Sequence, residues 1–96
     1  MSSADAFEVR DNAAAQRFEV EIEGRLAMIT YQRRGNTIVF THTEVPPELE
    51  GRGIASRMAR FALESAREQG LRVVARCPFV ASYIRRHPEY QSLLAE

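Results

Sequence analysis

A glycine-punctuated loop between an expected strand and an expected helix constrains the fold of this chain more than any other feature. Residues 45–55 read Val-Pro-Pro-Glu-Leu-Glu-Gly-Arg-Gly-Ile-Ala, and apolar residues recur at helical spacing over 53–69. The first N–H groups of a helix lack intrahelical partners, and the helix dipole adds positive charge there. Because Gly51 and Gly53 carry no Cβ, a phosphate group can approach their backbone closely. The loop therefore predicts a site for a phosphate-bearing ligand.

Strand patterns lie on both sides of this loop and helix. Residues 37–45 are rich in β-branched residues, and residues 71–77 alternate between apolar and polar side chains. Gly70 is a typical helix stop between them. Strands joined by one helix are normally parallel and form a right-handed β-α-β crossover. We therefore expect such a unit over residues 37–77.

The residues before this unit predict an antiparallel meander. Residues 17–23 alternate strictly, with three glutamates, Glu19, Glu21 and Glu23, on one face. Residues 34–36 form the turn of a tight hairpin between the runs 26–33 and 37–45. Residues 1–15 are expected to be frayed, or to hold a short edge strand around residues 7–9.

The residues after this unit predict a short helix from Pro78 to about residue 86, and a final turn over 91–96. The expected fold class is α/β (α+β): an antiparallel three-stranded meander followed by a β-α-β unit and a short C-terminal helix.

Composition limits the class of protein. Ninety-six residues, 45% of them hydrophobic, suit a single domain over 1–96. Thirteen arginines balance 13 acidic residues, which argues against a dedicated nucleic-acid binder. No apolar run of 18 residues and no basic-then-apolar leader are present, so we expect a cytoplasmic protein without a membrane partner. The single cysteine, Cys77, cannot form an internal disulfide.

Three ordered motifs resemble the GNAT superfamily of acetyl-CoA-dependent N-acetyltransferases, and more narrowly its compact YjdJ-type or NATD-type domains. They are the runs 41–45 (Thr-His-Thr-Glu-Val), 51–55 (Gly-Arg-Gly-Ile-Ala) and 77–90, which begins Cys-Pro-Phe-Val. The superfamily's loop signature is [Gln/Arg]-x-x-Gly-x-[Gly/Ala]. Residues 50–55 match it at Gly53 and Ala55 and depart from it at Glu50. The resemblance covers approximately residues 17–94 and implies a truncated GNAT-like fold.

The resemblance implies that acetyl-CoA or coenzyme A binds where the strands 37–45 and 71–77 splay apart. The cofactor arm would pair with the main chain of Thr43, Glu44 and Val45, and the phosphates would meet the loop and first helical turn. The residues expected there are Gly51, Arg52, Gly53, Ile54, Ala55 and Ser56. A carboxylate repels a pyrophosphate, so we expect Glu50 to point away and Arg52 to assist the backbone amides.

Four residues are candidates for the chemistry. Cys77 ends the second parallel strand and precedes a helix, a position that favours a thiolate. It is interpreted as an acetyl acceptor, a proton donor or a pocket-lining thiol, with an inert core cysteine as the alternative. His42 alternates with the apolar side chains before it, so it is expected on the apolar face as a general base or a core histidine. Glu44 on that face is the rival base, with simple exposure at the strand end as its alternative.

Tyr83 is the fourth candidate, as a general acid. The resemblance aligns Ile84 with the superfamily's usual tyrosine, which leaves Tyr83 about 100° away around the helix, and packing is its alternative role. Arg85 is expected to meet a phosphate of CoA or to stabilise the helix end. The glutamates of residues 17–23 are interpreted as an attractor for a cationic amine or as a solvated face.

The function expected from these features is transfer of an acetyl group to an amine acceptor, either a small molecule or a protein. A CoA-binding module with little or no catalysis is the alternative, and a nucleotide-binding regulatory domain needs only the phosphate cradle. The sequence identifies neither the acceptor nor the oligomeric state, and it implies no metal.

Overall fold

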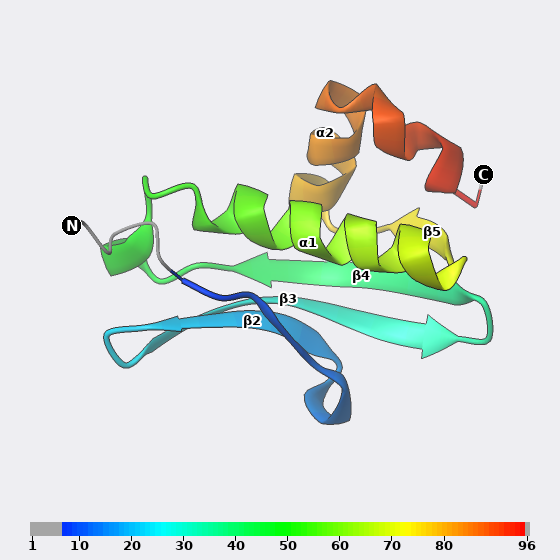
Figure 1. Ribbon diagram of the computed structural model, residues 1–96. Helices are drawn as coiled ribbons and strands as arrows, with labels where there is room; N and C mark the ends of the chain where they lie inside the picture. The colour runs from blue at the N-terminus through cyan, green and yellow to red at the C-terminus, as the bar shows by residue number, and fades with distance from the viewer. Residues whose placement is uncertain (1–6, 96) are drawn as a thin grey trace.

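The computed structural model describes residues 7–95, and these build a five-stranded sheet with its strands in sequence order. The strands are β1 (Arg10–Asn12), β2 (Arg17–Ile22), β3 (Arg25–Arg34), β4 (Thr37–Glu44) and β5 (Arg72–Ala75). Neighbours are antiparallel except β4 and β5, which are parallel (Figure 1). The predicted meander and β-α-β unit are confirmed, although β5 is shorter than expected.

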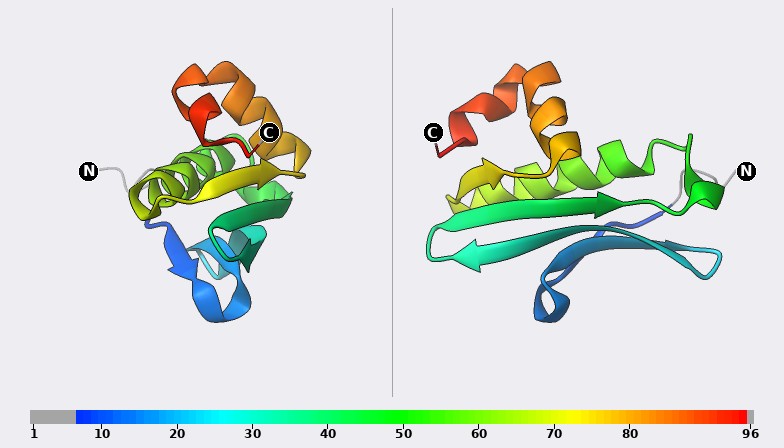
Figure 2. Two further views of the ribbon diagram at one scale, coloured as in Figure 1. Left: turned by 90° about the vertical axis from the view of Figure 1, so that its right-hand side faces the viewer. Right: turned by 180° about the vertical axis from the view of Figure 1, so that it is seen from behind.

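Helices cover one face of this sheet. The helical elements are η1 (Ala13–Ala15), η2 (Pro47–Leu49), α1 (Ile54–Gln69), α2 (Pro78–Arg86) and η3 (Pro88–Leu93). Helix α1 runs along the sheet, while α2 and η3 stand beside it next to β5 (Figure 2). Gly53 and Gly70, at the two ends of α1, have φ values of 73° and 70°. Both glycines therefore adopt the left-handed conformation that other residues avoid.

The hydrophobic core lies between the sheet and α1. Phe18, Ile29 and Phe40 from the strands pack with Met58 and Leu63 from the helix. The predicted apolar stripe of α1 is confirmed except at one position. Phe61 was expected in the stripe and is 43% exposed, because it lies at the margin of the stripe. Its ring still packs edge-to-face with the Phe18 ring, with the two centroids 5.9 Å apart.

The N-terminal segment differs from the expectation of a frayed end or of a strand around residues 7–9. Within the described residues, the edge strand is β1, at Arg10–Asn12, and residues 1–6 lie outside the described part of the chain. This strand covers one carboxylate of the expected glutamate face. Glu19 is only 2% exposed, and its carboxylate accepts hydrogen bonds from Arg10, Arg17 and Asn12. The interpretation of the three glutamates as one solvated or substrate-attracting stripe is therefore wrong for Glu19.

A β-bulge in β4 changes which side chains face the core. Thr30 of β3 pairs with His42, and the next residue, Tyr31, pairs with Phe40, so Thr41 is an extra residue in β4. The alternation shifts by one position beyond the bulge. Thr43 then faces the core side, while His42 and Glu44 point into solvent, with 65% and 63% of their side chains exposed. The expectation that His42 and Glu44 share the apolar face is wrong for this reason.

No helix within residues 7–95 is long and apolar enough to cross a membrane. The same part of the chain contains no group of three or more His, Cys, Asp or Glu side chains arranged to hold a metal ion.

Candidate functional site

A groove of about 640 Å³ opens where the end of β4, the glycine loop and the beginnings of α1 and α2 meet. It is lined by His42, Thr43, Glu44, Val45, Glu50, Gly51, Gly53, Ile54, Ala55, Ser56 and Phe79. Eight of these residues are those expected to contact a cofactor. The structure thus brings the strand end and the loop, which are separate motifs in the sequence, to one surface hollow.

The N-terminus of α1 forms one wall of the groove. Gly53 precedes the helix and supplies no side-chain hydrogen bond to it, and the first turn contains no acidic residue. The first intrahelical bond runs from the Arg57 N–H to the Gly53 carbonyl at 3.0 Å. The N–H groups of Ile54, Ala55 and Ser56, which form the first turn of α1, are therefore available to an anion.

The two glycines of the loop leave space in front of this helix end. Gly51 and Gly53 have φ values of 84° and 73°, and a Cβ added at either position would meet nothing within 4 Å. The loop thus uses left-handed angles, as predicted, and its backbone is open to a close approach. Fixed N–H groups beside open space are the requirements for binding a phosphate.

The opposite wall forms where β4 and β5 diverge. Their pairing ends at Phe40 and Ala75, while β4 continues to Glu44. The N–H groups of both Arg76 and Cys77 donate to the Phe40 carbonyl, at 3.0 Å each, so the chain turns away from β4 here. The last part of β4 therefore has an edge that β5 does not cover, as expected for a splay between the strands.

Cys77 lies at the base of this splay. It is 3% exposed, and its sulfur is 2.9 Å from the hydroxyl oxygen of Thr43. Thr43 lines the groove whereas Cys77 does not, so the thiol stands directly behind the groove wall. Cys77 is also the residue preceding α2, as the sequence predicted.

His42 and Glu44 form a second polar pair on the exposed side of the groove. The Nε2 atom of His42 lies 3.8 Å from a carboxylate oxygen of Glu44. Both side chains are open to solvent. The two candidate bases thus lie at one location, next to Thr43.

Glu50 and Arg52 of the loop each point in the direction opposite to the one expected. Glu50 lines the groove, although it was expected to point away. Arg52 does not line it, because its guanidinium turns toward Glu23 in the β2–β3 turn, at 4.0 Å. The structure thus does not place Arg52 in the groove, where it was expected to assist an anion.

Tyr83 and Arg85 of α2 also lie away from the groove lining. Tyr83 is buried, and its ring stacks on His87 with centroids 3.9 Å apart. Burial raises the pKa of Tyr83 above its usual value. This placement agrees with a packing role for Tyr83, the alternative to a role as general acid. Arg85 lines a separate cavity beside β5.

Sequence reasoning assigned no role in the groove to Phe79, which supplies its apolar surface from α2. A signal was present, because Phe79 follows Pro78 in the first turn of a helix that starts at the splay. Glu50 was noticed but was assigned the wrong direction. The direction of a loop side chain depends on φ and ψ at Gly51, which composition alone does not give.

Known proteins with related sequences or structures agree on one family. A model described as GCN5-related N-acetyl-transferase matches residues 17–93. Protein NATD1 of Xenopus tropicalis is 29% identical over 97% of this chain and 88% of its own. Protein NATD1 of Homo sapiens is 33% identical over 88% of this chain and 78% of its own.

A solved structure shows the same fold. The solution NMR structure of a GCN5-like candidate N-acetyltransferase from Staphylococcus aureus matches with a TM-score of 0.71 and 30% sequence identity. The match covers 98% of this chain and 90% of the other. The resemblance and the fold class expected from the motifs are confirmed, and this chain belongs to the GCN5-related N-acetyltransferase family.

Proposed function

We propose that this protein binds acetyl-CoA in the groove and transfers the acetyl group to an amine. One observation carries the proposal: the uncapped end of α1 and the uncovered edge of β4 open into the same hollow of about 640 Å³. The first feature suits the phosphates of coenzyme A and the second suits its amide-bearing arm. A nucleotide without such an arm would need only the end of α1.

The residues fit the cofactor in two stretches. The N–H groups of Ile54, Ala55 and Ser56 would hold the pyrophosphate, with Gly51 and Gly53 allowing its approach. The main chain of Thr43 and Val45 would pair with the arm, as an added strand pairs with an open sheet edge. Acetyl-CoA, when bound, supplies an acetyl group activated as a thioester.

The exposed pair, His42 and Glu44, removes a proton from the amine that accepts the acetyl group. An amine must lose its proton before it attacks a carbonyl carbon, and the His42 imidazole next to Glu44 is placed to accept that proton. The Glu44 carboxylate stabilises the imidazolium that results. Both side chains are open to solvent, so the acceptor can arrive without displacing the core.

The buried pair, Thr43 and Cys77, supplies a proton to the sulfur that leaves. The new C–N bond forms as the C–S bond breaks, and the departing sulfur needs a proton. Cys77 and Thr43 share a hydrogen bond at the splay, so the Thr43 hydroxyl, which lines the groove, would give its proton to the departing sulfur and take one from the Cys77 thiol behind it. Covalent transfer through Cys77 is the less favoured route, because the thiol lies behind Thr43 rather than in the groove lining.

The placement of Tyr83 and Glu50 favours a second candidate, a coenzyme A-binding module without efficient catalysis. Tyr83 packs on His87 instead of lining the groove, so no tyrosine acid is placed at the groove wall within the described residues. Glu50 places a negative charge beside the phosphate site. A module of this kind would bind the cofactor and leave the thioester intact.

Calorimetry tests the shared half of both candidates. We expect acetyl-CoA and coenzyme A to bind much more tightly than ATP, because only they occupy the edge of β4. Equal affinity for the three ligands would contradict the proposal. Release of free thiol in the presence of a panel of amines then separates the candidates: release above the uncatalysed rate supports the transferase, and tight binding with the uncatalysed rate supports the module.

A further inference from the structure

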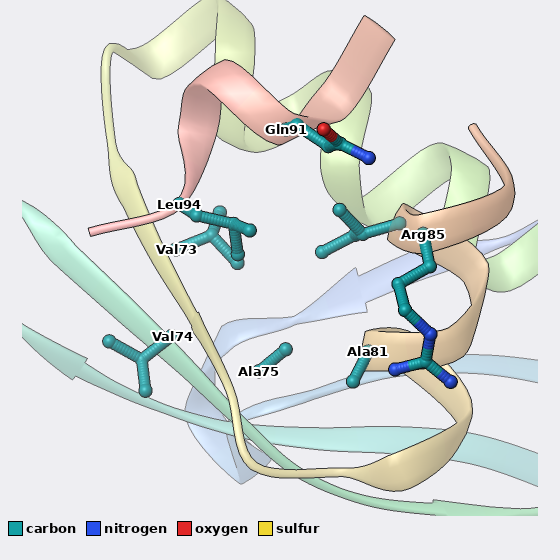
Figure 3. Close-up of a pocket in the computed structure, with 8 residues that line it drawn as sticks. Val73, Val74, Ala75, Ala81, Arg85, Gln91 and Leu94 are labelled. Atoms are coloured by element: carbon teal, nitrogen blue, oxygen red, sulfur yellow. The ribbon is translucent and has the colours of Figure 1, made fainter. Parts of the chain in front are cut away.

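A second cavity, of about 340 Å³, lies between the outer edge of β5, α2 and η3 (Figure 3). Its apolar wall includes Val73, Ala75, Ala81 and Leu94, and its polar side chains are Arg85 and Gln91. None of the residues that line it lines the acetyl-CoA groove. It is therefore a separate hollow with its own chemistry, of a size at the lower end of small-molecule sites.

The end of the chain builds and holds this cavity. Leu94 forms a parallel bridge with Val73, and the Ala95 N–H donates to the Val73 carbonyl at 2.9 Å. The Arg72 guanidinium donates to the carbonyl of Ser92 at 3.2 Å and also to the carbonyl of Leu94. These bonds fix η3 against β5, so the cavity is formed before any ligand arrives.

The edge of β5 is too short to take an added peptide strand. Arg72 and Arg76 donate their N–H groups toward β4, so Val73 and Ala75 direct theirs outward. The chain's own end already uses the carbonyl of Val73. Only Ala75 remains at the outer edge before the strand ends, and a strand partner needs several residues. A small molecule fits this space better than a peptide.

The polar side chains define the charge of that molecule. The Arg85 side chain runs along α2 and carries its guanidinium beside Ala81, while Gln91 extends from η3 toward α2 (Figure 3). Both residues are exposed at the mouth of the cavity. A guanidinium at the rim of an apolar hollow matches a carboxylate that carries an aliphatic chain.

We propose that this cavity binds a small aliphatic carboxylate, with its chain against Val73 and Ala75 and its carboxylate on Arg85. The guanidinium binds a carboxylate through two N–H groups. The site is independent of acetyl transfer, and it places a ligand against the back of the strand that leads to Cys77.

Titration with hexanoate, followed by calorimetry and by amide chemical shifts in NMR, tests the proposal. Hexanoate should bind, hexylamine should not because its head is cationic, and acetate should bind much more weakly because it has no chain. Arg85→Gln should weaken hexanoate binding about 10- to 100-fold, the effect of losing hydrogen bonds between charged groups. Arg86→Gln removes an exposed arginine from the same helix outside the cavity, and should leave the affinity within about twofold.

A second variant tests the hollow itself. Ala81→Leu fills it with a larger apolar side chain, so hexanoate binding should be lost while acetyl-CoA binding persists. Equal losses in Arg85→Gln and Arg86→Gln, or shifts confined to residues 53–56, would overturn the proposal. If Ala81→Leu does not fold, the two arginine variants still decide it.

Discussion

The hydroxyl oxygen of Thr43 and the sulfur of Cys77 lie 2.9 Å apart, across the point where β4 and β5 stop pairing. One residue belongs to the antiparallel meander and the other follows the crossover strand. Their contact exists because the bulge at Thr41 turns Thr43 toward the core side of β4. A local irregularity of the strand thus joins a groove-lining hydroxyl to a buried thiol.

The Thr43–Cys77 pair predicts a catalytic effect that is separate from cofactor binding. Cys77→Ala removes the proton donor and should lower kcat about 100-fold, with the affinity for acetyl-CoA nearly unchanged. Thr43→Val removes the hydroxyl that connects the thiol to the groove, so we expect a loss of similar size. Steady-state kinetics and calorimetry on the same samples measure both quantities.

Cys77→Ser is the matched control. The serine hydroxyl can keep the hydrogen bond to Thr43, but it is a far weaker acid than the cysteine thiol. Full turnover in both the Ala and the Ser variants would exclude any chemical role for the thiol. Mass spectrometry of the protein incubated with acetyl-CoA alone should show unmodified Cys77. An acetylated Cys77 would support the covalent route instead.

Gly53→Asn should weaken acetyl-CoA binding by about tenfold or more, which corresponds to ~1.4 kcal/mol. Asparagine tolerates a positive φ better than other side chains, so the fold should lose only about 1 kcal/mol. The new side chain would occupy the open space in front of the α1 N-terminus, where the phosphate is expected. Calorimetry and thermal unfolding separate the two effects.

Gly70→Asn provides the control, because Gly70 has nearly the same φ at the other end of α1 and equally open surroundings. It should cost similar stability and leave acetyl-CoA affinity unchanged. Equal affinity losses in the two variants would mean that stability, and not the site, governs binding.

Glu50→Gln should make acetyl-CoA bind roughly three- to tenfold more tightly at low salt. The carboxylate lines the groove, and removing it relieves about 1 kcal/mol of repulsion with the pyrophosphate. The gain should shrink as salt is added, because exposed charges are screened. Glu68→Gln, near the far end of α1, makes the same change in net charge and should have no effect. Unchanged affinity in Glu50→Gln would place the phosphates elsewhere.

Local patterns predicted the frame of the site because their signals lie within a few residues. The period of α1 and the glycines at its two ends set its position, and they placed residues 53–56 at the groove. The alternation of residues 71–77 likewise identified β5 and its buried face.

Features that depend on contacts between distant segments were not predicted. The bulge at Thr41 arises from the register between β3 and β4, so alternation placed His42 on the wrong face. Glu19 is buried because Arg10 of another strand reaches it, and nothing in residues 17–23 indicates that partner. The turn of Arg52 toward Glu23 depends on the β2–β3 hairpin in the same way.

His42→Gln should lower kcat about 100-fold and leave acetyl-CoA affinity unchanged, because the imidazole acts on the acceptor and not on the cofactor. Glu44→Gln should cost less, since it removes only the carboxylate that stabilises the imidazolium. His87→Gln changes a histidine that packs on Tyr83 outside the groove, so it should affect stability more than turnover. A loss of activity as large in His87→Gln as in His42→Gln would contradict the assignment.

Glu19 predicts how stability changes in acid. Hydrogen bonds from Arg17 and Arg10 lower its pKa from 4.5 to about 2 in the folded protein. A carboxylate whose pKa is lower in the folded protein stabilises the fold at any pH above its pKa in the unfolded chain. This contribution is lost as the pH falls from about 4.5 toward 2. Denaturant unfolding at a series of pH values should therefore show a declining free energy of unfolding across that range.

Glu19→Gln should flatten that decline, because the glutamine binds no proton in either state. At pH 7 the same variant should lose about 1–2 kcal/mol, since hydrogen bonds to a charged group become hydrogen bonds to a neutral one. Glu21→Gln, two residues along the same strand, removes an exposed carboxylate and should change neither the slope nor the stability much. If Glu21→Gln flattened the curve as strongly as Glu19→Gln, the acid sensitivity would reflect overall charge, and β1 would not be held to β2 by the buried carboxylate.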